Sequence, residues 1–156
     1  MNYNAEHMKR AIACSCENID QEGGPFGAVI VKDGKIIAEG TNRVTASNDP
    51  TAHAEIVAIR NATKYLNNFS LAGCQIYTSC EPCPMCLSAI YWARIDAIYY
   101  ANTRDDAKEI GFDDSFIYDE IALSMEKRAI PIQQFLREEG LEAFKKWSTT
   151  SDKTAY

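Results

Sequence analysis

Several features that define other protein classes are missing from this sequence. It has no hydrophobic stretch long enough to span a bilayer, and its first residues lack the apolar core of a secretory signal. It also has no internal repeat, low-complexity tract or second-domain linker. With 46% hydrophobic and 24% charged residues, the 156-residue chain is expected to form one cytoplasmic globular domain covering residues 1–156.

Positive charge is also scarce. The 16 Lys and Arg residues are outnumbered by 22 Asp and Glu residues, which gives a formal net charge of -6 at pH 7. Such a balance repels phosphate backbones. We therefore expect a small neutral ligand, and neither nucleic acid nor membrane as a partner.

The six cysteines are the first positive signal. Without a secretory signal disulfides are not expected, and the close series Cys80, Cys83 and Cys86 is more typical of metal ligands. The other three lie among apolar residues and are expected to be buried: Cys14, Cys16 and Cys74.

His53, Cys83 and Cys86 would supply one imidazole and two thiolates. Zinc prefers four such ligands in a tetrahedron, and a site with three protein ligands leaves one position for water, which is the catalytic arrangement. Glu55, two residues after His53, is then free to carry a proton between that water and a leaving group. We predict one Zn2+ per subunit, with Glu55 catalytic.

The spacing of these residues predicts where they lie. Side chains two residues apart in mid-helix point to nearly opposite sides, so His53 and Glu55 can converge only at a helix's first turn. Capping residues and a proline at 47–51 precede a helix expected over about 53–65, and Pro84 suits the first turn of a second helix. The positive ends of both helices would favour the thiolate forms of Cys83 and Cys86.

The other elements follow from periodicity and turn residues. We expect helices over about 3–20 and 136–147, a hairpin over 26–39 around Asp33-Gly34, and strands at 74–79 and 97–101. Residues 103–120 read as a polar stretch with an acidic loop, and Pro131 restricts any fifth strand at 130–134 to a sheet edge. His7 is expected at the surface. The order of these helices and strands along the chain predicts an α/β fold, in which a mixed sheet carries helices on both faces.

Other interpretations of the cysteines stay open. Cys80 could complete a closed Cys3His structural site, which would leave Glu55 idle and make the protein a non-catalytic zinc-binding module. An iron-sulfur site is disfavoured because position 90 is Ile, so the fourth ligand of the common run is missing. Cys80 is more simply explained as a buried residue at a strand end.

His-x-Glu followed by Pro-Cys-x-x-Cys is the signature of zinc-dependent nucleobase deaminases. Four segments around it extend the likeness over nearly the whole chain: 24–31, 48–55, 78–86 and 111–116. In these segments the sequence resembles the bacterial guanine deaminases of the cytidine deaminase-like superfamily. The resemblance implies a three-layer α/β/α sandwich with a five-stranded mixed sheet, a homodimer, and conversion of guanine to xanthine and ammonia.

The resemblance also implies residue roles. Asp114 would contact the base and assist catalysis, and Tyr156 would close a pocket from a tail of residues 148–156 exchanged between subunits. The other substrate contacts would be Phe26, Asn42, Ala54 and Trp92. From the residues alone, the two aromatics could equally be core residues, Asn42 a turn residue and Asp114 a solvated loop charge.

The acidic loop bears on the choice of base. Guanine presents N1–H and an amine as adjacent donors, which a carboxylate complements because it only accepts hydrogen bonds. Adenine and cytosine offer mixed edges that suit Asn or Gln better. The loop therefore favours guanine, while deamination of guanosine, cytosine or adenosine, including adenosine in transfer RNA, remains the alternative.

Overall fold

The computed structural model describes residues 3–155, which divide into two compact units, one ending at Asp114 and one beginning at Ser115. None of the described helices is long and apolar enough to cross a bilayer. The single domain over residues 1–156 stays a prediction.

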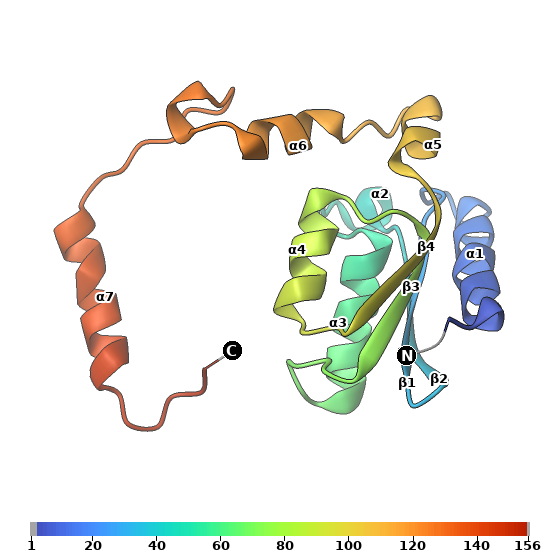
Figure 1. The fold of residues 1–156 in the computed structure, drawn as a ribbon, viewed down its shortest axis with the longest axis horizontal. Coiled ribbons are helices and arrows are strands. Elements are labelled where there is room, and N and C mark those ends of the chain that lie inside the picture. Colours follow the sequence, from blue (N-terminus) through green and yellow to red (C-terminus); the bar gives the residue numbers. More distant parts are fainter. Residues whose placement is uncertain (1–2, 156) are drawn as a thin grey trace. The chain divides into compact units, whose positions relative to one another are not determined.

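The first unit is a four-stranded mixed sheet with helices on both faces (Figure 1). The strands lie in the order β2-β1-β3-β4; β1 is antiparallel to β2 and β3, and β3 is parallel to β4. Its elements are α1 (Ala5–Ile19), β1 (Gly27–Lys32), β2 (Lys35–Thr41), α2 (Val44–Ser47), α3 (Ala54–Leu66), β3 (Cys74–Cys80), α4 (Pro84–Trp92), β4 (Ala97–Asn102) and α5 (Arg104–Glu109).

The two faces of β1 explain the layers. Ala28 and Ile30 point to one side, where they join a buried cluster with residues of α3 and α4. Val29 and Val31 point to the other side, where they pack with residues of α1. A strand buried on both faces requires a helix layer on each, so the predicted three-layer α/β/α arrangement is confirmed.

One prediction for the later part of the chain is wrong. The sheet formed by the described residues has four strands rather than five, because 130–134 form no strand. Pro131 lacks the N–H that a ladder needs. The polar stretch at 103–120 contains two helices that were not predicted: Thr103 and Asp106 form a capping box that starts α5, and α6 (Ser115–Ala122) follows.

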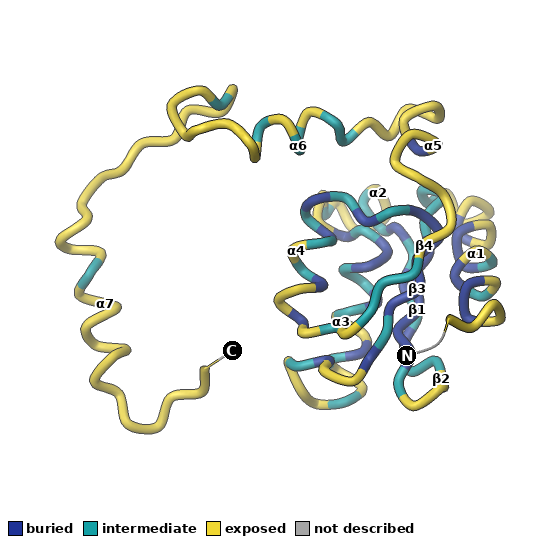
Figure 2. The backbone as a smooth tube through the Cα atoms, viewed as in Figure 1, coloured by how far each residue is buried: buried dark blue, intermediate teal, exposed yellow. Residues whose placement is uncertain are grey.

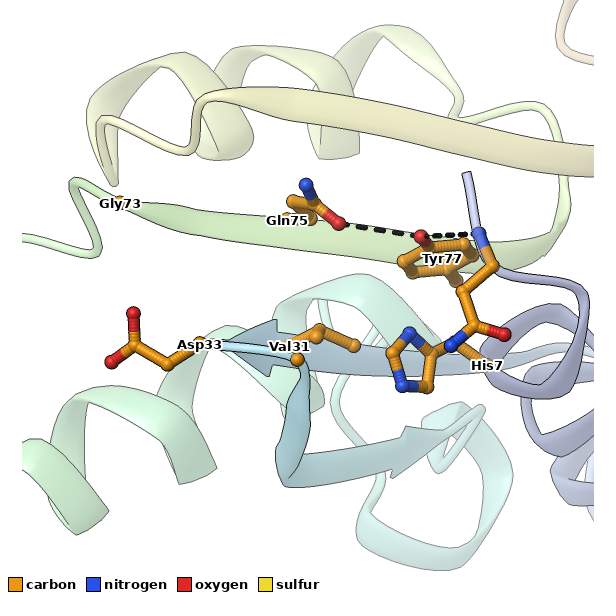
Figure 3. Close-up of a pocket in the computed structure, with 8 residues that line it drawn as sticks. His7, Val31, Asp33, Gly73, Gln75 and Tyr77 are labelled. Atoms are coloured by element: carbon orange, nitrogen blue, oxygen red, sulfur yellow. Dashed lines mark hydrogen bonds between the residues drawn. The ribbon is translucent and has the colours of Figure 1, made fainter. Parts of the chain in front are cut away.

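The predictions for His7 and Cys16 are also wrong. His7 faces the sheet and is 9% exposed, and its ring meets the Tyr77 ring edge-on with centroids 5.2 Å apart. The Tyr77 hydroxyl accepts from the Asn4 backbone N–H and donates to Gln75, beside a cavity of about 330 Å³ (Figure 3).

Cys16 is exposed because it is two residues from buried Cys14 on one helix.

Gly40 on β2 lets α3 approach the sheet closely. A Cβ at this position would collide with the backbone of Ala54 and Ala58. The first turn of α3, which carries Glu55, is therefore held against β2 by the absence of a side chain.

Gly40→Ala is expected to lower the free energy of unfolding by about 1–3 kcal/mol, because the backbone of α3 must move to admit the methyl group. Urea titration followed by circular dichroism measures the change. Gly140→Ala is the control, since a Cβ there meets nothing within 4 Å and alanine favours a helix. Equal stability of the Gly40 variant and the wild type would contradict this role for Gly40.

The second unit contains α6, the short 3-10 helix η1 (Met125–Lys127) and α7 (Arg137–Thr149). None of these helices has a buried residue, and Figure 2 shows most of the segment as exposed. Its exposed large apolar side chains are Phe116, Ile121, Leu123, Met125, Ile130, Ile132, Phe135, Leu136, Phe144 and Trp147. Residues 115–155 of the second unit therefore form no hydrophobic core of their own.

Candidate metal centre and substrate site

Both ligand segments begin a helix. His53 is the N-cap of α3 and Cys83 the N-cap of α4, each with extended backbone angles, and Pro84 occupies the first turn of α4. Glu55 and Cys86 lie in the first turns of the same two helices. The predicted placement at two helix N-termini is confirmed, and their partial positive charges favour anionic ligands there.

The three ligands fit zinc. Cys83 Sγ lies 3.6 Å and Cys86 Sγ 3.5 Å from His53 Nδ1, and all three ligand atoms lie within 4.8 Å of one another. A tetrahedral zinc with ordinary bond lengths to sulfur and nitrogen places such atoms about 3.6 Å apart. His53, Cys83 and Cys86 are therefore spaced as zinc ligands, and Nδ1 is the histidine atom that would bind.

The electrostatics of the cluster suit a metal as well. Hydrogen bonding to Cys86 first, and to His53 next, lowers the pKa of Cys83 to about 4, so this sulfur is already a thiolate at neutral pH. Glu55 is 6% exposed, and burial raises the pKa of its carboxyl above the ordinary value. A raised pKa means that this carboxyl holds a proton more readily than an exposed glutamate does, which suits a group that carries protons.

Cys80 is not part of this group. Its Sγ donates to the backbone oxygen of Thr103 at 3.5 Å, and it is 6% exposed at the end of β3. Among residues 3–155 the ligand group consists of His53, Cys83 and Cys86 alone. The interpretation of Cys80 as a buried strand-end residue is confirmed, and the closed Cys3His site is not formed.

Of the residues predicted to contact substrate, Asp114 lies close enough to the cluster for the charge of Cys83 to act on it. Asp114 is half-buried, and burial first, then the charge of Cys83, raises the pKa of its carboxyl. Phe26 meets Phe112 edge-on, with ring centroids 4.9 Å apart. By contrast, Asp113 forms an ion pair with Lys108 at 3.1 Å.

Asn42 is 8% exposed and stabilises the turn after β2, since its Oδ1 accepts a hydrogen bond from the backbone N–H of Val44. Because this contact uses the Oδ1 oxygen, the side-chain N–H groups are the part of the amide that a ligand could engage. Ala54 is buried beside His53 at the start of α3.

Trp92 is placed differently from what a core aromatic requires. It is 64% exposed at the end of α4, where it lines a cavity of about 350 Å³ with Ser88, Tyr91 and Arg94. Its interpretation as a core residue is therefore wrong. Tyr156 lies outside the described residues.

Comparison with known proteins identifies the family. Residues 1–102 match the cytidine and deoxycytidylate deaminase zinc-binding region. A guanine deaminase of Bacillus subtilis is 57% identical over 150 residues, which are 96% of each chain. The chain belongs to this deaminase family.

A solved structure and a relative with a different substrate give two further comparisons. The X-ray structure of a guanine deaminase from Bacillus subtilis matches with a TM-score of 0.95 and 56% identity, covering 100% of this chain and 99% of that one. A transfer-RNA-specific adenosine deaminase of Buchnera aphidicola is 33% identical over 87% of this chain and 88% of its own. As a family member the chain is a zinc-dependent hydrolytic enzyme, with His53, Cys83 and Cys86 as its candidate zinc site.

Sequence reasoning missed two neighbours of the site. Thr78 Oγ1 lies 3.5 Å from Glu55 Oε1, and Phe112 packs on Phe26. Strand alternation could have indicated that Thr78 faces the same side as Ile76. The Phe112 contact joins residues 86 positions apart through a loop, for which the sequence carries no periodic signal.

Proposed function

We propose that the protein catalyses the hydrolytic deamination of guanine to xanthine and ammonia. The observation that carries the reaction type is a group of three zinc ligands with a buried, uncoordinated Glu55 beside it. The choice of guanine rests on the 57% identity to a guanine deaminase over nearly the whole chain, against 33% to a transfer-RNA adenosine deaminase.

When bound by His53, Cys83 and Cys86, zinc would lower the pKa of a coordinated water to about 7. Glu55 accepts a proton from the attacking water and delivers it to the ring nitrogen beside the amine-bearing carbon. It then takes the remaining proton from the hydroxyl now bonded to that carbon and passes it to the amine. The C–N bond breaks, ammonia leaves and the carbonyl of xanthine forms. Burial supports the proton-holding part of this role, because it raises the pKa of the Glu55 carboxyl.

The substrate contacts follow from hydrogen-bond complementarity. The Asp114 carboxylate would accept from N1–H and the amine of guanine, and Asn42 would donate its amide N–H groups to a ring acceptor. Phe26, supported by Phe112, would stack on the base, with Ala54 beside it. Trp92 is not placed among these contacts, because the cavity that it lines contains none of the other site residues. Asp114 would also assist Glu55 in proton transfer to the amine.

The direct test is ammonia release by zinc-loaded protein from guanine, guanosine, cytosine, adenine and adenosine, each presented separately. Guanine is expected to give the highest kcat/KM. Faster turnover of another base or nucleoside would assign the enzyme to that substrate, and turnover of none would support the non-catalytic zinc module.

Asp114→Asn is expected to raise KM for guanine or lower kcat/KM by about 10- to 100-fold, since a charged hydrogen bond to the base is weakened. Steady-state kinetics measure the change. Asp113→Asn is the matched control, because Asp113 already pairs with Lys108 and should leave KM within about twofold. An unchanged KM and kcat for Asp114→Asn would make it a solvated loop charge.

We also propose that the enzyme is a cytoplasmic homodimer. Support for a dimer comes from the second unit, whose large apolar side chains are exposed and whose described residues include none that is buried. Support for a reducing compartment comes from six free cysteines. Light scattering is expected to give twice the 17.4 kDa of one chain, and a monomer would refute the dimer.

Exchange of the tail at 148–156 can be tested by mixing two impaired variants. In a mixed dimer, one subunit carries Glu55→Gln with an intact Tyr156, and the other carries Tyr156→Ala with an intact Glu55. If the tails are exchanged, the intact Tyr156 of the first subunit closes the site of the second, which has the intact Glu55. Activity should therefore recover on mixing, while tails that close their own sites would give no recovery. Full activity of Tyr156→Ala by itself would contradict the role of the tail.

A further inference from the structure

Thr78 lies on the face of the sheet that α3 covers. It is 2% exposed, and strand alternation places it on the same side as Ile76, which packs against α3 and α4. Thr78 Oγ1 donates to the backbone oxygen of Cys80 at 3.0 Å and lies 3.5 Å from Glu55 Oε1. Because a hydroxyl has one proton and can rotate, it can donate to either oxygen.

The other oxygen of Glu55 has a contact that zinc would remove. Glu55 Oε2 accepts from Cys86 Sγ at 3.4 Å. A cysteine that binds zinc does so as a thiolate and has no proton to donate. With Cys86 bound to a metal, Oε2 would lose this donor. Of the side-chain contacts found for the carboxylate among the described residues, the one with the Thr78 hydroxyl would remain, together with Glu55's own backbone N–H.

We propose that Thr78 is a positioning residue that holds Glu55 Oε1, so that Oε2 is the oxygen that carries the proton. The inference rests on the proposed function, in which Glu55 moves protons. The terminal torsion of a glutamate is soft, so a carboxylate without a fixed oxygen samples many orientations. Loss of the hydroxyl would reduce the fraction of molecules in the reactive geometry and would act on kcat rather than on KM.

Thr78→Val removes the hydroxyl while nearly keeping the shape of the side chain. Its kcat for guanine is expected to fall about 10- to 100-fold, the usual range for a supporting hydrogen bond, with KM within about threefold and zinc content unchanged. Thr78→Ser restores the hydroxyl and should recover most of kcat.

Ser79→Ala is the matched control. Ser79 is the next residue on β3, points to the opposite face and is equally buried at 2% exposed, and its hydroxyl accepts from the backbone N–H of Gly27. Its loss should lower stability but leave kcat within about twofold. A wild-type kcat for Thr78→Val, or an equal fall in Ser79→Ala, would overturn the proposal.

A second measurement separates this inference from the proposed function. If the wild type does not deaminate guanine, that function fails, and crystal structures of zinc-loaded wild type and Thr78→Val still test Thr78. The wild type is expected to keep Glu55 Oε1 within hydrogen-bond distance of the hydroxyl, and the variant to show a rotated carboxylate. The same carboxylate orientation in both structures would overturn the role of Thr78.

Discussion

Glu55→Gln is expected to retain zinc and lose nearly all deaminase activity. Glutamine keeps the size of the side chain and can still accept hydrogen bonds at one oxygen, but it cannot take a proton near neutral pH. Since general acid-base catalysis contributes about 10²- to 10⁴-fold, and one group serves both proton transfers here, kcat should fall by about 10³-fold or more. Single-turnover ammonia release measures the deaminase activity, and metal analysis of the same sample measures the zinc content.

Retention of zinc is what makes this variant informative. Glu55 lies beside the ligand group but is not part of it, so its replacement should leave one metal per chain. Glu109→Gln, on α5, is the control for the loss of one carboxylate and should behave as wild type. Loss of zinc in Glu55→Gln would make Glu55 a ligand, and a wild-type rate would remove its proton-transfer role.

The parts of the fold that the sequence predicted are those set by local chemistry. Asp33 and Gly34 both have left-handed backbone angles, which is what a two-residue hairpin turn requires, and the predicted hairpin is confirmed. Pro84 is the first residue of α4, as predicted, and α3 begins one residue after the predicted start at His53. The capping residues expected at 47–51 do not cap α3, whose N-cap is His53 itself. Because the ligands lie at these helix starts, the metal centre could be predicted with the fold.

The parts that the sequence did not predict depend on contacts between distant residues. Burial of His7 follows from the packing of α1 on Tyr77, 70 residues away, and histidine carries no composition signal for burial. The segment at 130–132 has the apolar composition of a strand. Its side chains are nevertheless exposed, and its backbone pairs with no strand. The partner that would cover the second unit is not encoded in any local pattern, so the dimer stays a proposal.

Zinc binding itself provides the second large effect. The apparent free energy of zinc binding at a structural site is about 10–16 kcal/mol, shared among four ligands. The loss of one ligand should therefore weaken zinc binding by roughly 100-fold or more. Cys86→Ala removes a ligand that is 0% exposed and is expected to yield protein with little zinc, no measurable deamination and a lower Tm. Dialysis of the wild type against a chelator should reproduce these changes, and added zinc should reverse them.

Cys80→Ala distinguishes a ligand from a buried thiol in the same segment. Cys80 Sγ contacts the backbone oxygen of Thr103 and lies outside the ligand group, so this variant should keep one zinc per chain and most of its activity. Its Tm should fall only by the small amount that a lost buried contact costs, about 1 kcal/mol in stability. Equal zinc loss in the Cys80 and Cys86 variants would mean that four side chains close the metal site, and a closed site leaves no position for the water that deamination requires.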